Sequence, residues 1–283
     1  MSKLLVIPSS KKDLNLDVDG FIIGIKNLSV NANFYIDIKN IEKIIKKIKD
    51  DKKEVFILLN KNIFNKDLKL LEEALIKLNN LNIDGLLYYD ISVLSLVTKL
   101  NLNIPLIWSQ EHLTTNYLTC EFYKEKNVKG VYLSAEITLK EIEEITHNTT
   151  LKTIVPIFGY LPMFSSKRHV VKNYLNTFKL KDKSKTNYIE KENKLYPIID
   201  NKNEVTVYNS HILNGLGEYL DLKVDYVTLN SFNIDSLKFR KIIKMFKTAN
   251  KNNVKTYDEE INKMFNNVDK GFLYKETIYK VKK

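Results

Sequence analysis

Short apolar segments alternate with amphipathic segments along most of this chain. In eight of them both faces are apolar, which is typical of parallel β-strands buried on both sides. They cover residues 4–8, 21–25, 55–59, 85–89, 105–108, 131–133, 153–158 and 224–229. The pattern therefore predicts eight strands that share one interior.

The segments between these strands carry apolar residues at helical spacing. Isoleucines at i, i+3, i+4 and i+7 predict one helix, and a similar leucine series predicts a second. A capping box of Thr138 and Glu141 predicts a third helix start, and Asp235 caps a last one. The apolar positions are Ile41, Ile44, Ile45, Ile48, then Leu68, Leu71, Leu75, Leu78, then Phe239, Ile242, Ile243 and Phe246.

Eight strands with helices between them predict an α/β protein with a (β/α)₈, TIM-barrel-like fold. An open doubly wound sheet is the alternative. Closure suits eight strands better because it leaves no exposed sheet edge. The connection from residue 8 to residue 21 is too short for an ordinary helix, so we expect the first unit to be irregular.

The barrel domain is predicted to span residues 1–248, with an insertion at about 161–222 between strands seven and eight. Within the insertion we expect a helix near 166–176, β-segments at 187–189 and 204–208, and a polar surface loop at 179–186. Residues 249–253 form a predicted linker. The tail up to residue 283 contains a predicted short strand or clasp at 271–277.

The composition, 44% hydrophobic and 28% charged, is that of a soluble globular protein and not of a disordered chain. No run of residues has the length and apolar character of a membrane span. The single cysteine, Cys120, excludes an internal disulfide, a CxxC zinc site and a cysteine-held iron–sulfur cluster, and indicates the cytoplasm. The four histidines have no metal-ligand spacing, so we expect no metal site. Cys120 falls in a helical pattern and is predicted to be a buried, inert thiol.

The net charge is +11, from 45 basic and 34 acidic residues. A basic chain of this kind suggests a nucleic-acid partner. However, all the basic residues except Arg168 and Arg240 are lysines, and a genome of low G+C content produces the same bias. A functional basic face and a genomic bias both remain open.

In a barrel of this type, function gathers where the strands end. The residues expected there are Ser9, Ser10, Lys26, Asn27, Asn60, Asn62, Asp90, Ser109, Gln110, Glu111, Ser134, Glu136, Asn230 and the segment 159–163. Asp90, Glu111 and Glu136 could hold a metal or perform acid–base chemistry. The alternative is that these acids are solvated loop carboxylates and helix caps.

Two further features have a functional and a structural interpretation. Ser166, Lys167 and Arg168 are predicted to open a helix, whose free N–H groups and two cations suit a phosphate or a carboxylate. The alternative is a serine cap with exposed bases. Trp108 at a strand end is either a core residue or a surface on which a ring could stack.

Four motifs resemble those of peptidase family U32, the collagenase-like proteases. They are PIFGYLPMFSSKR at 156–168 with Asn173 and Tyr174, IWSQE at 107–111 with Thr115 and Asn116, LSAE at 133–136, and GFLYKET at 271–277. The resemblance covers nearly the whole chain and is closest to short bacterial members without a cysteine-bound cluster. It implies a barrel fold.

The chain departs from the family pattern at five positions. An arginine is usual at Ala135, a histidine at Phe158, a cysteine region at Pro162, and a lysine and an acid at Thr228 and Asn230. These changes remove acid–base and anion-binding groups. Either the remaining residues carry the chemistry, or the chain is the partner of a longer paralogue.

The resemblance implies a peptidase by name, but several relatives hydroxylate RNA bases, including prephenate-dependent formation of 5-hydroxyuridine in tRNA. We therefore expect a part in wobble-uridine hydroxylation, with tRNA and a longer paralogue as partners and prephenate as a substrate. A genuine peptidase and a non-catalytic scaffold or binding subunit are the alternatives. The predicted catalytic residues are Glu111, Glu136 and Asn116, and the predicted substrate-binding residues are Trp108, Gln110, Ser166, Lys167, Arg168 and Asp90.

Overall fold

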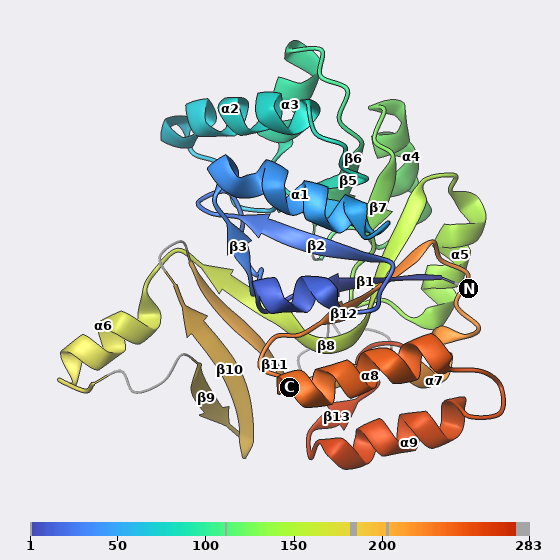
Figure 1. The fold of residues 1–283 in the computed structure, drawn as a ribbon. Helices are drawn as coiled ribbons and strands as arrows, with labels where there is room; N and C mark the ends of the chain where they lie inside the picture. Colours follow the sequence, from blue (N-terminus) through green and yellow to red (C-terminus); the bar gives the residue numbers. More distant parts are fainter. Residues whose placement is uncertain (1, 111, 182–185, 202–203, 276–283) are drawn as a thin grey trace.

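The fold is a closed barrel. A computed structural model describes residues 2–110, 112–181, 186–201 and 204–275 (Figure 1). In this part of the chain eight parallel strands pair in a ring, because β12 hydrogen-bonds to both β1 and β8. The strands are β1 (Lys3–Ile7), β2 (Gly20–Ile25), β4 (Glu54–Leu59), β5 (Gly85–Tyr88), β6 (Leu106–Ser109), β7 (Gly130–Tyr132), β8 (Lys152–Ser166) and β12 (Tyr226–Asn230). Each predicted strand is present, so the (β/α)₈ prediction is confirmed and the open sheet is excluded.

The strands are apolar on both faces because each face meets a different core. Alternate residues such as Ile22, Phe56 and Ile107 fill the barrel interior. The residues between them, such as Phe21 and Ile57, face the surrounding helices. Burial on both sides removes the polar alternation of a half-exposed strand.

The helices cover the barrel from outside (Figure 1). They are α1 (Ile41–Asp50), α2 (Leu68–Asn79), α3 (Ile91–Lys99), α4 (Tyr117–Glu125), α5 (Leu139–Asn148) and α8 (Ser236–Thr248). The capping box of α5 forms as predicted, because the Glu141 carboxylate accepts from the Thr138 backbone N–H at 2.6 Å. The irregular first unit is also confirmed, since β1 and β2 are joined by the short 3₁₀ helix η1 (Lys11–Asn15). The chain between β2 and α1 adds β3 (Tyr35–Ile36) and η2 (Ile38–Asn40).

The insertion continues strand β8 beyond the barrel. The first half of β8 pairs with β7 and β12, and its second half pairs antiparallel with β11 (Val205–Asn214). Next to β11 lie β10 (Lys194–Asp200) and β9 (Asn187–Lys191), which stand with α6 (Val170–Thr177) to one side of the barrel (Figure 1). The short α7 (Leu216–Tyr219) leads back to β12.

The change of partner occurs at Gly159. Its φ of +115° is accessible to glycine, and a Cβ atom here would lie 2.5 Å from the carbonyl oxygen of Asn230. The strand continues to Ser166 because β11 supplies hydrogen bonds that the sequence pattern does not reveal. The predicted helix at 166–176 therefore begins only at Val170. Strand β10 was not predicted, and residues 182–185 of the predicted loop lie outside the described residues.

The C-terminal segment packs on the barrel. The predicted linker is followed by a helix that the sequence analysis missed, α9 (Val254–Met264), whose Ile261 is fully buried. Strand β13 (Val268–Asp269) then pairs with β11, and Leu273 is buried. Residues 276 and 277 of the predicted clasp lie outside the described residues.

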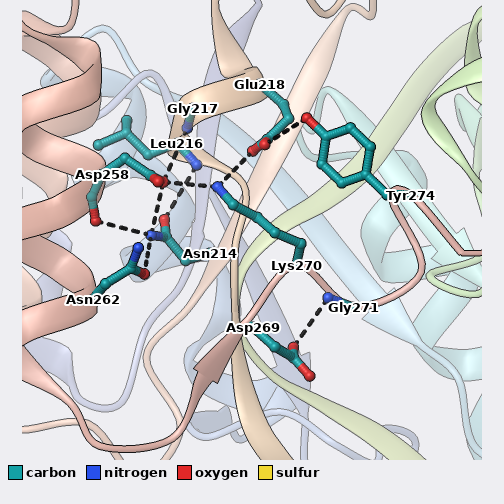
Figure 2. A network of polar contacts seen from close by, with 10 residues as sticks. All are labelled: Asn214, Leu216, Gly217, Glu218, Asp258, Asn262, Asp269, Lys270, Gly271 and Tyr274. Atoms are coloured by element: carbon teal, nitrogen blue, oxygen red, sulfur yellow. Dashed lines mark hydrogen bonds and ion pairs between the residues drawn. The ribbon is translucent and has the colours of Figure 1, made fainter.

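A polar network fastens this segment (Figure 2). The Lys270 ammonium group lies 3.0 Å from Glu218 and 2.8 Å from Asp258, and the Tyr274 hydroxyl donates to Glu218 at 2.9 Å. The buried Asn214 donates to Asp258 and Asn262. We call these residues, Asn214, Glu218, Asp258, Asn262, Lys270 and Tyr274, the clasp network.

Candidate functional site at the barrel mouth

A cavity of about 110 Å³ opens at the ends of the strands. All eight barrel strands contribute to its wall, so it lies on the barrel axis. Its apolar lining comprises Ile7, Ile22, Leu58, Leu87, Pro156, Phe158, Leu161, Pro162, Met163, Ala135 and Phe272, and its polar lining comprises Asn31, Asn60, Ser109, His112, Tyr132, Glu136, Asn209, Thr228 and Asn230. This is the place where a barrel of this type binds its ligand.

A second hollow adjoins the cavity. The two share Asn31, Asn60, His112 and Met163, and the second hollow adds Asn62, Gln110, Glu204 and Ser165, among others. Asparagine and glutamine amides thus surround the opening. Amides offer both donors and acceptors, so they suit a neutral polar ligand better than a strongly charged one.

Several polar residues of the mouth are held in place by hydrogen bonds. Asn60 accepts from the Val30 N–H at 2.9 Å, and the Tyr132 hydroxyl lies 2.7 Å from the Thr228 hydroxyl. Asn230 accepts from the Asn33 amide at 2.8 Å and donates to the Tyr160 carbonyl oxygen. These contacts fix the polar surface before any ligand arrives, which lowers the ordering cost of binding.

The titratable groups in the described lining of the central cavity are Tyr132 and one pair at its edge. His112 Nδ1 lies 3.3 Å from a Glu136 oxygen, and both side chains are about two-fifths exposed. The neighbouring backbone is fixed, because Ser134 accepts from the Glu136 N–H and Gln110 from the His112 N–H. An imidazole beside a carboxylate is an arrangement that acid–base catalysis uses, so this pair could carry acid–base chemistry.

The structure brings some of the predicted site residues to the mouth. Glu136 lines the cavity and Gln110 lines the adjoining hollow. Glu111 lies outside the described residues. Among the described residues no three metal-ligating side chains come together, and the absence of a metal site remains an expectation.

Trp108 does not line the mouth. It is buried between the sheet and the helices, where its ring stacks on Tyr123 at 4.2 Å and meets the edge of Tyr88. Its position in the strand points it outward, since successive residues alternate between the two faces. Trp108 is therefore a core residue and not the stacking surface that was predicted as its functional role.

Asp90 and Asn116 are helix caps. Both Asp90 carboxylate oxygens accept backbone N–H groups, one from Ser92 of α3 and one from Ile63. Asn116 accepts from the Thr119 N–H at the start of α4 and lines neither hollow. Both side chains satisfy backbone groups at helix starts, as asparagine and aspartate commonly do.

Ser166 is the last residue of β8, and Lys167 and Arg168 lie in the bend that follows it and not in the first turn of a helix. The start of α6 is already occupied, because Asp200 accepts from the Lys172 N–H and lies 2.6 Å from His169. This helix start is therefore not an anion site. Lys167 instead reaches back to the barrel mouth, where its ammonium group lies 3.5 Å above the Phe64 ring.

Cys120 is fully buried on α4, as predicted, and its thiol donates to the Asn116 carbonyl oxygen. Burial raises the pKa of the thiol to about 11. Because the thiolate is the reactive form, this cysteine is inert at neutral pH.

A serine, a histidine and an aspartate meet beside the mouth in an arrangement unlike a protease triad. The Ser210 hydroxyl lies 2.9 Å from His211 Nδ1, and Asp269 lies 3.8 Å from the same nitrogen. In a Ser-His-Asp triad the serine and the aspartate address opposite ring nitrogens. This trio therefore lacks the geometry that activates a nucleophile.

The lining residues that the sequence analysis missed include His112, Tyr132 and four that come from outside the strand ends. Asn31 follows β2, Glu204 and Asn209 come from the insertion, and Phe272 comes from the C-terminal segment. Phe272 stands inside the motif at 271–277, which could have drawn attention to it. Nothing in the local pattern of Asn31, Glu204 or Asn209 indicates that they reach the mouth.

The profile of peptidase family U32 matches residues 9–283. The chain belongs to peptidase family U32. It is 25% identical to the tRNA hydroxylation protein P2 of Bacillus subtilis, over 98% of this chain and 99% of that protein. It is also 34% identical to an uncharacterized protease of Methanocaldococcus jannaschii over 49% of this chain, but only 33% of that longer protein is covered.

Solved structures support the same fold. A U32 peptidase structure superposes with a TM-score of 0.52 at 13% identity, over 81% of this chain and 92% of that one. A dihydrodipicolinate synthase structure gives 0.50 at 11% identity, over 93% and 82%. In the described part of this U32 chain, no helix is long and apolar enough to cross a membrane.

The five departures from the family pattern meet at one place. Ala135, Phe158, Pro162, Thr228 and Asn230 all line the central cavity. Thr228 forms the neutral hydroxyl pair with Tyr132, and the ring of Phe158 packs against Phe246 on the helix side. Neutral residues thus line the cavity at the positions where the resemblance implies charged or ionisable groups.

Proposed function

We propose that this chain takes part in 5-hydroxylation of the tRNA wobble uridine, together with a longer paralogue of the same family. The observation that carries the proposal is the end-to-end match to the tRNA hydroxylation protein P2 of Bacillus subtilis. Because nearly all of both chains align, the match covers the barrel, the insertion and the C-terminal segment. A role in tRNA modification implies a cytoplasmic protein.

The chemistry of the mouth supports a nucleobase as ligand. Enzymes that modify a base bring it out of the stack into a pocket that reads its polar edge and covers its faces. Here apolar residues such as Leu58 and Pro156 line the walls, while Asn60, Asn209 and Asn230 provide amides. Uracil is planar and neutral, and its edge carries both donors and acceptors, so it matches this lining.

The lining also supports a division of labour with a paralogue. A dicarboxylate such as prephenate needs cations, and the described lining of the central cavity offers only His112, when protonated. We therefore propose that the paralogue supplies the anion-binding groups for prephenate. In this chain Glu136 and His112 would position polar groups or move a proton at the mouth. Glu111 keeps its proposed catalytic role on the strength of the resemblance.

The test is mass spectrometry of tRNA nucleosides from a strain in which the gene for this chain is deleted. We expect 5-hydroxyuridine and its derivatives to disappear, and to return when the wild-type chain is supplied from a plasmid. Deleting the gene for the longer paralogue should give the same loss. Unchanged 5-hydroxyuridine in the deletion strain would contradict the proposal.

A peptidase is the second candidate, favoured by the names of two of the proteins that this chain resembles. The purified chain should then digest casein or gelatin, and the activity should disappear in Glu136→Ala.

A non-catalytic scaffold is the third candidate function. In that case Glu136→Gln would restore modification as fully as the wild type, while deletion of the whole chain would abolish it.

A further inference from the structure

An exposed aromatic ring flanked by cations stands at the rim of the mouth. Phe64 lies in the loop between β4 and α2, two residues after Asn62 of the adjoining hollow. Its side chain is about half exposed. The Lys167 ammonium group lies 3.5 Å from the ring centroid and that of Lys66 lies 5.9 Å away. Two ammonium groups from separate segments of the chain therefore lie over the ring.

The loop that carries this ring is held rigidly. The 3₁₀ helix η3 (Asn65–Asp67) follows Phe64, whose carbonyl oxygen accepts from the Asp67 N–H at 2.7 Å. The Asp67 carboxylate accepts from the Phe64 N–H and pairs with Lys61 at 3.2 Å. Lys61 also donates to the Asn27 carbonyl oxygen at 3.0 Å. A surface group fixed in this way binds a partner at little ordering cost.

Charged groups gather around the ring. Lys66 and Lys167 lie over it, and Lys61 pairs with the Asp67 carboxylate. The pKa of Lys167 is lowered, first by desolvation and then by the charge of Lys61, while Asp67, Glu204 and Asp90 act in the opposite direction. The ammonium groups of Lys66 and Lys167 both lie over the ring, where they are placed to pair with phosphates that flank a stacked base.

We propose that Phe64 is a stacking platform for an unpaired base of RNA, with Lys66 and Lys167 as contacts for the flanking phosphates. This inference rests on the proposed function and identifies where the anticodon loop would be held beside the mouth. Proteins bind single-stranded nucleic acid by combining stacked aromatic rings with a cationic path for the backbone. A base would replace the Lys167 ammonium group on the ring, and the lysine would turn to the neighbouring phosphate.

The chain offers a matched control. Phe122 on α4 is also about half exposed, and Lys126 lies over its ring at 5.5 Å. It lies in the outer layer of helices, in the second turn of α4, and lines neither hollow of the mouth. Phe122→Ala therefore removes an aromatic ring with a cation partner from a place where no RNA is expected.

The experiment is a fluorescence anisotropy titration of the purified full chain with a labelled anticodon stem-loop RNA at ~0.1 M salt. We expect Phe64→Ala to weaken binding about tenfold and Phe64→Trp to preserve it, because stacking depends on the ring. Lys167→Met should weaken binding several-fold and reduce the salt slope by about one, as loss of one phosphate contact does. Phe122→Ala should bind like the wild type, and urea unfolding should verify that each variant is folded.

Equal affinity of Phe64→Ala and Phe122→Ala would overturn the inference, as would the absence of measurable binding by the wild type. Competition by polyglutamate as strong as that by unlabelled RNA would overturn it in favour of an acidic protein partner. Failure of the proposed function would be seen separately, as unchanged 5-hydroxyuridine in the deletion strain. If the deletion removes 5-hydroxyuridine but Phe64→Ala binds RNA and restores modification like the wild type, only the inference fails.

Discussion

The mouth of the barrel and the clasp network are both rich in polar side chains, but their polar groups are satisfied differently. In the clasp network Lys270 lies between Glu218 and Asp258, and Asp258 also accepts from Asn214 and the Gly217 N–H. Each charged group of this network has a partner within the protein. At the mouth, Asn60, Asn209 and Glu136 also have partners within the protein, but their side chains line open volume.

Whether polar side chains line open volume distinguishes a candidate site from a structural cluster better than the number of charged groups does. In the clasp network, hydrogen bonds and ion pairs link four titratable groups in a chain, Tyr274 to Glu218, Glu218 to Lys270 and Lys270 to Asp258, and the network fastens the C-terminal segment to the barrel (Figure 2). The mouth carries fewer charges, yet all eight strands converge on it. Substitutions at the clasp should therefore affect stability, and substitutions at the mouth should affect function.

Gly159→Ala should have the largest effect on stability, although it lies next to the mouth. The new Cβ atom would lie 2.5 Å from the Asn230 carbonyl oxygen, at a backbone φ of +115°. Steric strain and the unfavourable backbone conformation together should lower the free energy of unfolding by about 4 kcal/mol. Urea denaturation followed by circular dichroism measures this. A loss below about 1 kcal/mol would mean that the junction of β8 relaxes easily.

Lys270→Met should come second. The Glu218 side chain is 8% exposed, and the substitution removes the cationic partner of this buried carboxylate, which keeps the neutral Tyr274 hydroxyl as a donor. Because the Lys270 side chain is itself 31% exposed, we expect a loss of about 2–3 kcal/mol, below the value for a fully buried pair. Lys241→Met is the control, since its pair with Glu260 is exposed and should contribute less than about 0.5 kcal/mol. Equal losses of unfolding free energy in the two variants would contradict the expected difference between the clasp network and an exposed ion pair.

Tyr274→Phe should have a smaller effect that depends on pH. The lost hydroxyl donates to Glu218, so a decrease of about 1 kcal/mol is expected at neutral pH. Desolvation and the Glu218 hydrogen bond raise the pKa of Tyr274 to about 12 in the folded protein. Its stabilising contribution is therefore complete below pH ~10 and is lost as the pH rises towards 12. The difference between wild type and variant should shrink between these values in urea titrations, and a constant difference would contradict this.

Glu136→Gln should have the smallest effect on stability and a clear effect on function. The pair with His112 is about two-fifths exposed, so the free energy of unfolding should change by less than about 0.5 kcal/mol. If Glu136 acts at the mouth, the 5-hydroxyuridine content of the complemented deletion strain should fall at least about tenfold. Glu143→Gln on α5 is a control carboxylate away from the mouth. Full modification by Glu136→Gln would show that the modification does not need the Glu136 carboxylate.

The sequence by itself determined the architecture of the barrel. Runs of apolar residues marked each strand, because burial on both faces leaves no polar alternation. Isoleucine spacing and the Thr138–Glu141 capping box marked helices, because both signals depend on residues within one or two turns. The irregular first unit was predicted from the short connection between residues 8 and 21 alone. These features are local, so a single sequence contains them.

The site depended on tertiary structure, because side-chain direction and long-range pairing decide it. Trp108 and Ser109 are neighbours in β6, yet one packs among helices and the other lines the cavity. Strand β8 runs on to Ser166 because it pairs with β11, a strand that begins only at Val205, and the helix therefore starts later than predicted. Asn209 and Phe272 reach the mouth only through the fold. Hydrophobic periodicity gives the faces of an element, but closure of the barrel decides which face meets the ligand and which meets the core.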